Sequence, residues 1–294
     1  MKEGIISGGP VLPRSINYDS PGDIRAFLEE YGLGMRKKYG QNFLINKAIR
    51  SKLIEELELE KSEEVWEIGP GLGAMTKGLL ETGARLTAFE IDPAFSRALR
   101  DFFSSYPTFT LIEGDVFKTW KTVPAGERLF LLGNLPYNIA AAIMGDFIEK
   151  QRFFTRMVIT VQNEVALRMT AAPGTADYSS FSVLCSSVYK IKPLRIIKGS
   201  CFYPVPRVDS RALRLDLLEN RVKRPAVFYP LVRRLFSSRR KTIRNTLRDF
   251  AASAIIAEDV LKLAGISGER RAETLGLEEF AALASCLEGF VPHG

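Results

Sequence analysis

The order of apolar runs and amphipathic stretches along the chain predicts the fold. Short runs of mainly apolar, β-branched and aromatic residues have the character of strands, and apolar residues three and four positions apart have the character of helices. Expected strands are one that begins with Val65-Trp66 and others at 85–90, 109–113, 128–132, 156–162, 189–198 and 211–217. Helical stretches separate the first three of these strands. We therefore expect a mostly parallel, doubly wound sheet with its ligand at the carboxyl ends of the strands.

The amphipathic stretches place the helices. Helices are expected at 21–32, 47–57, 74–80, 93–100 and from 164 onward, and the segment 178–188 is a helix or a connection. Residues 1–20 are rich in Gly, Pro and Ser, and we expect them to pack loosely. Residues 224–294 have helical character throughout, with Gly265 and Gly276 as expected helix stops. This pattern indicates a helical second domain after the sheet.

One stretch links the first strand to the helix at 74–80, with the sequence E-I-G-P-G-L-G at 67–73. Strand, glycine-rich turn and helix together bring backbone N–H groups close to a nucleotide-like ligand. Side chains at Gly69 or Gly71 would block that approach. The spacing is not the G-x-G-x-x-G of dinucleotide enzymes. Glu90 ends the second strand 19 residues after Gly71, the interval at which such folds place an acid against ribose hydroxyls; the alternative is an exposed loop acid.

The ends of the next strands carry the remaining candidate chemistry. Asp115 follows the third strand and can accept a hydrogen bond from an adenine amine. The sequence N-L-P-Y at 134–137 follows the fourth strand, although it could also be a simple turn. Asn134 offers an acceptor and Tyr137 a flat face for a base, worth ~1–3 kcal/mol. Two acceptors on an exocyclic amine would free its lone pair for an electrophile.

Composition and charge narrow the function. The net charge is +7, and residues 207–248 hold 13 Lys and Arg against 3 Asp and Glu, while the rest of the chain holds 28 and 31. Such an excess suits an anionic partner, most often nucleic acid. His293 is the only histidine, so a histidine base is not expected. The three cysteines form no C-x-x-C pair, and no apolar run is long enough for a membrane span, so we expect a soluble cytoplasmic protein.

Two segments are candidates for nucleic-acid contact. Arg240, Arg244 and Arg248 follow i, i+4 spacing and are expected on one helix face, where phosphate contact competes with a solvated charged face. The stretch C-F-Y-P-V-P-R-V-D-S at 201–210 is expected to be a proline-stiffened loop that presents Phe202 and Tyr203, although core aromatics are the commoner explanation.

These motifs together resemble one family. K-K-Y-G-Q-N-F-L at 37–44, the glycine loop, F-E-I-D, G-D-V, N-L-P-Y, the 202–210 stretch and R-R-K-T-I-R-N at 239–245 occur in the order seen in bacterial small-subunit rRNA adenine dimethyltransferases. The resemblance covers roughly residues 35–287. It implies a Rossmann-like class I methyltransferase with a seven-stranded, mostly parallel sheet plus a small all-helical domain, divided into an N-terminal extension 1–34, a methyltransferase domain 35–220 and an RNA-binding domain 221–294.

The resemblance also implies roles for individual residues. S-adenosylmethionine would be the methyl donor, without a metal, and two adjacent adenosines near the 3′ end of 16S rRNA would be dimethylated at N6. The implied cofactor-binding residues are Gln41, Asn42, Leu44, Gly69, Gly71, Glu90, Ile91, Asp115, Val116 and Asn134. The implied catalytic residues are Asn134, Leu135, Pro136, Tyr137 and Phe202. The implied RNA contacts are Arg207, Arg239, Arg240, Lys241, Arg244 and Arg248.

The implied partner is small-subunit rRNA within a partly assembled 30S subunit, bound by a monomer that takes part in subunit biogenesis. Three alternatives stay open at this point. The chain could modify large-subunit rRNA as drug-resistance methyltransferases do, although R-R-K-T-I-R-N speaks against it. It could be a non-catalytic nucleic-acid binder on the same fold, although the intact N-L-P-Y speaks against that. A nicotinamide dehydrogenase disagrees with both the loop spacing and the histidine content.

Overall fold

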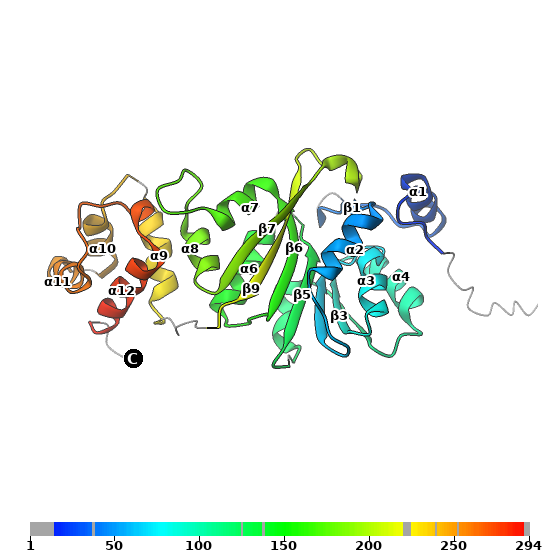
Figure 1. The fold of residues 1–294 in the computed structure, drawn as a ribbon, viewed down its shortest axis with the longest axis horizontal. Coiled ribbons are helices and arrows are strands. Elements are labelled where there is room, and N and C mark those ends of the chain that lie inside the picture. The colour runs from blue at the N-terminus through cyan, green and yellow to red at the C-terminus, as the bar shows by residue number, and fades with distance from the viewer. Residues whose placement is uncertain are drawn as a thin grey trace, which may run out of the picture. The chain divides into compact units, whose positions relative to one another are not determined.

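A computed structural model describes residues 15–36, 39–124, 126–136, 139–219, 225–238, 240–251 and 253–290. Seven strands form one sheet in the order β4-β3-β2-β5-β6-β9-β7, and two short strands, β1 and β8, form another (Figure 1). Contacts divide the chain into two compact units, residues 1–136 with 197–208 and residues 137–196 with 209–294. The expected domain boundaries after residues 34 and 220 differ from this division and stay a prediction.

The first unit holds four strands that pair in parallel. They are β2 (Glu64–Ile68), β3 (Arg85–Glu90), β4 (Phe109–Glu113) and β5 (Leu129–Asn134). Because β2 pairs in parallel with both β3 and β5, Ile68 lies opposite Phe89 on one side and Gly133 on the other. The carboxyl ends of these strands therefore meet at one edge, where the glycine loop and Asn134 emerge.

The described part of the first unit has four helices at the predicted places and one, at 116–119, that the sequence did not predict. They are α1 (Pro21–Glu30), α2 (Lys47–Glu55), α3 (Ala74–Glu81), α4 (Pro93–Phe103) and α5 (Val116–Thr119), with a 3₁₀ turn η2 (Trp120–Thr122). Asn46 caps α2 by accepting from the Ile49 amide at 3.0 Å. In α1, Ile24, Phe27 and Leu28 are buried, as the sequence pattern predicts.

Two predictions for this unit are wrong in detail. Phe202 and Tyr203 do not lie in a loop but form strand β8 (Phe202–Tyr203), which pairs antiparallel with β1 (Phe43–Leu44). A 3₁₀ turn η3 (Gly199–Cys201) precedes β8. The expected loose packing does not hold for residues 15–20, since Tyr18 and Asp19 bond to the body of the unit. Two-residue strands pair through tertiary contacts, which sequence periodicity cannot reveal.

The second unit contributes the remaining strands and helices. β6 (Arg156–Gln162) pairs antiparallel with β9 (Ser210–Leu217), and β7 (Tyr189–Ile197) follows β9 in the sheet order. The helices before β9 are α6 (Ala140–Glu149), α7 (Asn163–Thr170) and α8 (Ser180–Ser186). The prediction of a seven-stranded, mostly parallel sheet is thereby confirmed.

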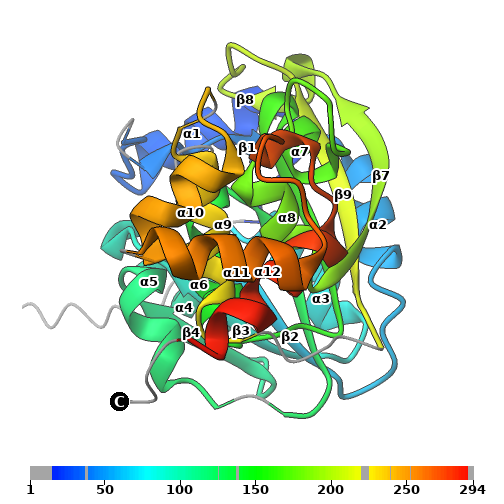
Figure 2. The ribbon, with the colours of Figure 1, turned by 90° about the vertical axis from the view of Figure 1, so that its left-hand side faces the viewer.

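The C-terminal region is helical, as predicted. Its elements are α9 (Phe228–Phe236), α10 (Ile243–Ala251), α11 (Ala254–Ala264), η4 (Ala272–Thr274) and α12 (Leu277–Glu288) (Figure 2). Their shared core includes Val183 and Tyr178 from the α7–α8 region, and the Tyr178 hydroxyl donates to the Leu275 carbonyl at 2.9 Å. Gly265 ends α11 with φ of +67°, but Gly276 precedes the first residue of α12 and therefore starts a helix.

Candidate active site

The glycine loop between β2 and α3 holds a backbone that only glycine adopts without strain. Gly69, Gly71 and Gly73 have φ values of +69°, +60° and +86°. A Cβ at Gly71 would lie 2.9 Å from the ring of Phe43, whereas a Cβ at Gly69 would meet only the Pro136 ring, at 4.0 Å. Gly71 is thus needed for packing as well as conformation. The space at Gly69 leaves room for a ligand against the backbone.

Glu90 ties the end of β3 to this loop. Its Oε2 accepts from the Gly71 amide at 3.2 Å and its Oε1 from the Asp92 amide at 2.8 Å. The side chain is only 4% exposed, and burial raises its pKa to about 7 against the opposing backbone hydrogen bonds. Glu90 is therefore no exposed loop acid. Each carboxylate oxygen keeps further acceptor capacity, so ribose recognition stays a prediction that this geometry allows.

Glu67 is a buried acid that the sequence did not mark as a site residue. It is fully buried at the carboxyl half of β2, and its Oε2 accepts from the Thr76 hydroxyl at 2.7 Å. Among the described residues, its Oε1 has no hydrogen-bond partner. Burial raises the pKa of Glu67 to about 8, and the charge of Glu90 acts in the same direction. The E-I-G motif contained the signal, because an acid inside an otherwise apolar strand needs an explanation.

Asn134 at the end of β5 is oriented by the segment before β1. Its Nδ2 donates to the Asn42 carbonyl oxygen at 2.8 Å. A carbonyl can only accept, so the amide nitrogen must face Asn42 and the side-chain oxygen Oδ1 must face away. Oδ1 accepts no hydrogen bond from the described residues. The structure thus joins two predicted site residues 92 positions apart and leaves one acceptor available for a ligand.

Polar side chains connect Arg36 and Gln41 to the start of α4. Gln41 accepts from the Arg36 amide through Oε1 at 2.9 Å and donates through Nε2 to Asp92 at 3.4 Å. Asp92 is fully buried, caps α4 through the Ala94 amide at 3.0 Å and lies 3.9 Å from the Arg36 guanidinium. The sequence assigned Asp92 only to the helix start. Its place between Glu90 and Gln41 makes it part of the candidate site.

The other predicted residues differ in accessibility. Asp115 caps α5 by accepting from the Phe117 amide at 3.0 Å, Val116 is buried and Ile91 is 42% exposed. Leu44 and Leu135 are buried, and Pro136 is half-buried. Phe202 is 1% exposed, so in this structure its ring presents no open face to a base. Tyr137 and Arg239 lie outside the described residues.

The predicted RNA contacts that the structure describes are exposed, but several are already paired. Arg244 forms ion pairs with Glu258 at 2.8 Å and Glu269 at 2.7 Å, and Lys241 pairs with Asp249 at 3.1 Å. The count of acids within residues 207–248 missed these partners because all three come from beyond residue 248. Exposed ion pairs contribute little to stability, so a phosphate can displace them.

The structure places Arg240 outside the helix where it was predicted. Arg240 lies in the turn before α10. The prediction that it shares a helix face with Arg244 and Arg248 is therefore wrong. Arg207, Arg240 and Arg248 are all exposed.

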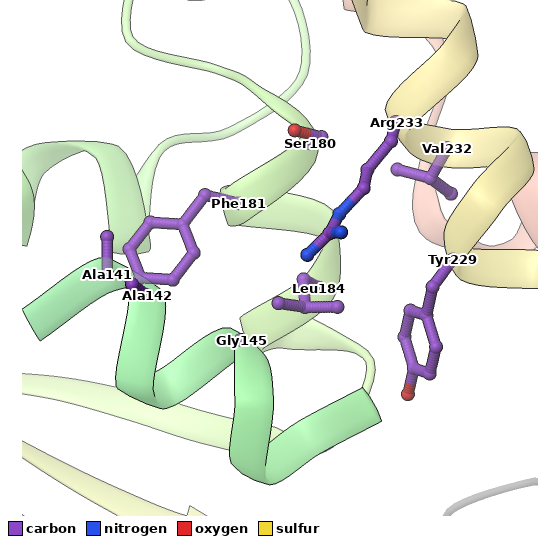
Figure 3. A pocket seen from close by; sticks show the side chains of 9 residues that line it. All are labelled: Ala141, Ala142, Gly145, Ser180, Phe181, Leu184, Tyr229, Val232 and Arg233. Carbon is purple, nitrogen blue, oxygen red and sulfur yellow. The ribbon is translucent and has the colours of Figure 1, made fainter. Parts of the chain in front are cut away.

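Two described pockets lie elsewhere. One of about 90 Å³ is lined by residues of α6, α8 and α9, and the Arg233 side chain extends from α9 toward Leu184 (Figure 3). The other, of about 280 Å³, is bordered by residues 16–19, α2 and α3. Neither is lined by a predicted cofactor or catalytic residue. In the described part of the chain, no group of three or more His, Cys, Asp or Glu is placed to hold a metal, and no helix has the length and apolarity to cross a membrane.

Comparison with known proteins identifies the family. The family model for ribosomal RNA adenine dimethylases matches residues 32–287. The chain belongs to the ribosomal RNA adenine dimethylase family. It is 45% identical over 280 residues to the ribosomal RNA small subunit methyltransferase A of Treponema denticola, an alignment that covers 92% of this chain and 96% of that protein.

Two solved structures of methyltransferases share the fold. A dimethyladenosine transferase from Plasmodium falciparum has a TM-score of 0.69 at 25% identity, covering 81% of this chain and 94% of that one. The 23S rRNA methyltransferase ErmE has a TM-score of 0.61 at 25% identity, covering 83% and 99%. The predicted class I methyltransferase fold and the resemblance to the dimethylase family are both confirmed.

Proposed function

We propose that this chain uses S-adenosylmethionine to dimethylate N6 of two adjacent adenosines near the 3′ end of 16S rRNA, as a monomer acting in the cytoplasm on a partly assembled 30S subunit. The family membership and the close small-subunit relative support the substrate. The observation that carries the chemistry is the fixed amide of Asn134, whose oxygen is available while its nitrogen is held by Asn42.

The residues present fit the proposed cofactor. The open space at Gly69 admits a ligand against the loop, and Glu90 keeps acceptor capacity at the end of β3, where ribose hydroxyls would donate. Asp115 would accept from the adenine amine, and Gln41, Asn42 and Leu44 would cover the site from the other side. Ile91 and Val116 would pack against the adenine. When bound, the cofactor supplies an electrophilic methyl group.

The chain's own residues would prepare the target amine. Asn134 Oδ1 would accept one N–H of adenine N6, and the Leu135 carbonyl would accept the other. Both bonds favour a pyramidal nitrogen whose lone pair is no longer shared with the ring. Pro136 lacks an N–H and fixes the turn, and Tyr137 and Phe202 would hold the ring of the flipped base, which requires Phe202 to become accessible. No histidine base is needed in this scheme.

The RNA surface is proposed to combine Arg207 with the basic residues around the start of α10. These are Arg239, Arg240, Lys241, Arg244 and Arg248. The proposed division of labour assigns residues 35–220 to methyl transfer and 221–294 to RNA binding.

Transfer of labelled methyl groups to unmethylated 30S subunits tests the proposal. The wild type should yield labelled dimethyladenosine, and Asn134→Ala should reduce the rate at least about a hundredfold, within the range that loss of one aligned acceptor produces. Asn134→Asp is the sharper variant, because a carboxylate oxygen would then face the Asn42 carbonyl and the pair would repel. Full activity of Asn134→Ala on 30S subunits would refute the assigned role.

The likeness to ErmE favours one second candidate, modification of large-subunit rRNA. Protein-free 23S rRNA included in the same assay separates the two. Preferential methylation of 23S rRNA would replace the first proposal. Calorimetry with S-adenosylmethionine separates both enzymes from a non-catalytic RNA binder.

A further inference from the structure

The segment 16–31, here called the N-terminal strap, lies outside the residues matched by the family model, which begins at 32. It was expected to be loose over its first part, yet it bonds to three separate parts of the candidate cofactor site. Each contact lies within the same compact unit. These contacts indicate that the strap contributes to the structure of the candidate cofactor site.

The first contact is on the glycine loop itself. The Tyr18 hydroxyl donates to the Leu72 carbonyl at 2.9 Å. Leu72 stands between Gly71 and Gly73, the two glycines whose left-handed conformations shape the turn into α3. Burial raises the pKa of Tyr18 to about 12, so the phenol keeps its proton and remains a donor through the neutral range.

The second contact runs through a buried arginine to β1. Asp19 Oδ1 pairs with Arg50 Nη2 at 2.8 Å, and Arg50 Nη1 donates to the Leu44 carbonyl at 2.7 Å. Arg50 is 7% exposed and its guanidinium lies 5.9 Å from the centre of the Tyr18 ring. The strap thereby fixes the backbone of Leu44, a predicted cofactor contact.

The third contact comes from α1. Ile24 and Phe27 share a buried cluster with Leu72 of the glycine loop and Phe95 of α4. On the exposed side, Arg25 Nε donates to the Tyr203 hydroxyl at 3.3 Å, and Tyr203 pairs with Phe43 across β8 and β1. The strap thus contacts the glycine loop and strand β8, and it reaches strand β1 through Arg50.

We propose that the N-terminal strap sets the geometry of the cofactor site and that Tyr18 is its positioning residue. This inference rests on the proposed use of S-adenosylmethionine. By holding the Leu72 carbonyl, Tyr18 keeps the loop in the conformation that directs the Gly71 amide to Glu90. Tyr18 acts through the loop and touches no reacting atom, so it should govern cofactor affinity and leave the chemical step unchanged.

Calorimetric titration of the full chain with S-adenosylmethionine tests this role. Tyr18→Phe removes only the hydroxyl and should weaken binding by about three- to tenfold, the effect of losing one hydrogen bond that holds the loop. The KM for the cofactor should rise by the same factor while kcat stays at the wild-type value. Tyr106→Phe is the matched control, because the Tyr106 ring packs on Phe103 and no contact of its hydroxyl with a described residue is present.

Hydrogen exchange provides a second readout in the absence of cofactor. Amides of 71–73 should exchange faster in Tyr18→Phe than in the wild type or the control. If the wild type binds S-adenosylmethionine and Tyr18→Phe has the same affinity, the same KM and the same amide exchange at 71–73, the positioning role of Tyr18 is refuted. The proposed function would then still stand. A wild type that binds no S-adenosylmethionine would overturn the proposed function, and the strap's role with it.

Discussion

The buried acid Glu67 predicts an unusual dependence of stability on pH, which replacement by glutamine should remove. Glu67→Gln keeps the shape of the side chain and an oxygen for the Thr76 hydroxyl, but cannot ionise. In the folded protein the pKa of Glu67 is about 8, against an ordinary value of 4.5 in the unfolded chain. Between these values the folded state holds a proton that the unfolded state has released.

The sign of the effect follows from this difference in bound protons. Below pH 4.5 both states are protonated, and above pH 8 both are ionised, so the contribution is constant there. In the window between them the free energy of unfolding falls as pH rises, by up to ~1.4 kcal/mol per pH unit. From pH 5 to pH 7 the wild type should thus lose up to about 3 kcal/mol relative to Glu67→Gln.

Urea unfolding at pH 5, 6, 7 and 8 measures this loss. Both tryptophans, Trp66 beside Glu67 and Trp120, lie buried in the first compact unit, so their fluorescence reports the unfolding of the unit that contains the acid. Glu90 also has a raised pKa and is present in both proteins, so their difference reports the loss of the Glu67 carboxyl together with its interaction with Glu90. Glu127→Gln removes an exposed carboxylate and is the matched control.

The expected result is a difference in unfolding free energy that grows with pH for Glu67→Gln and stays flat for Glu127→Gln. Parallel pH profiles of the wild type and Glu67→Gln from pH 5 to 8 would show that Glu67 is already ionised in the folded protein. The reasoning from burial would then be refuted.

Two further predictions concern the loop and the RNA surface. Gly71→Ala brings a methyl group to 2.9 Å from the Phe43 ring and forces an L-residue to φ of +60°, so unfolding free energy should fall by roughly 1–3 kcal/mol; thermal melting checks this, and an unchanged Tm would contradict it. Replacing Arg240 and Arg248 by glutamine should make the salt dependence of rRNA affinity shallower by about 1 per lost phosphate contact, measured by filter binding; exposed Arg97→Gln on α4 should leave the slope unchanged.

The sequence predicted the elements that depend on local pattern. The strands 85–90, 109–113 and 156–162 have the predicted bounds. The strand 156–162 was the plainest of them, because Met157 to Val161 are all buried and such a strand is a continuous apolar run. The glycine loop was also readable, since its left-handed residues must be glycine.

Pairings between distant segments were not readable. The strands β1 and β8 have only two residues each, too few to show the alternation of apolar and polar residues that marks a strand in a sequence. The ion pairs of Arg244 reach Glu258 and Glu269, which are neighbours only after α10 and α11 fold together. The role of Tyr18 likewise depends on a carbonyl 54 residues further along the chain.

Asn134 shows where motif and fold contribute different information about one residue. The motif N-L-P-Y specifies an amide, a group that presents a donor and an acceptor on opposite sides. Which side faces the target cannot be read from the motif, because either orientation has the same sequence. The Asn42 carbonyl decides it, since it binds the nitrogen and turns the oxygen toward the side where an amine would donate. In the proposed mechanism Asn42 therefore orients the acceptor, and a variant that moves the Asn42 backbone should impair methyl transfer even with Asn134 intact.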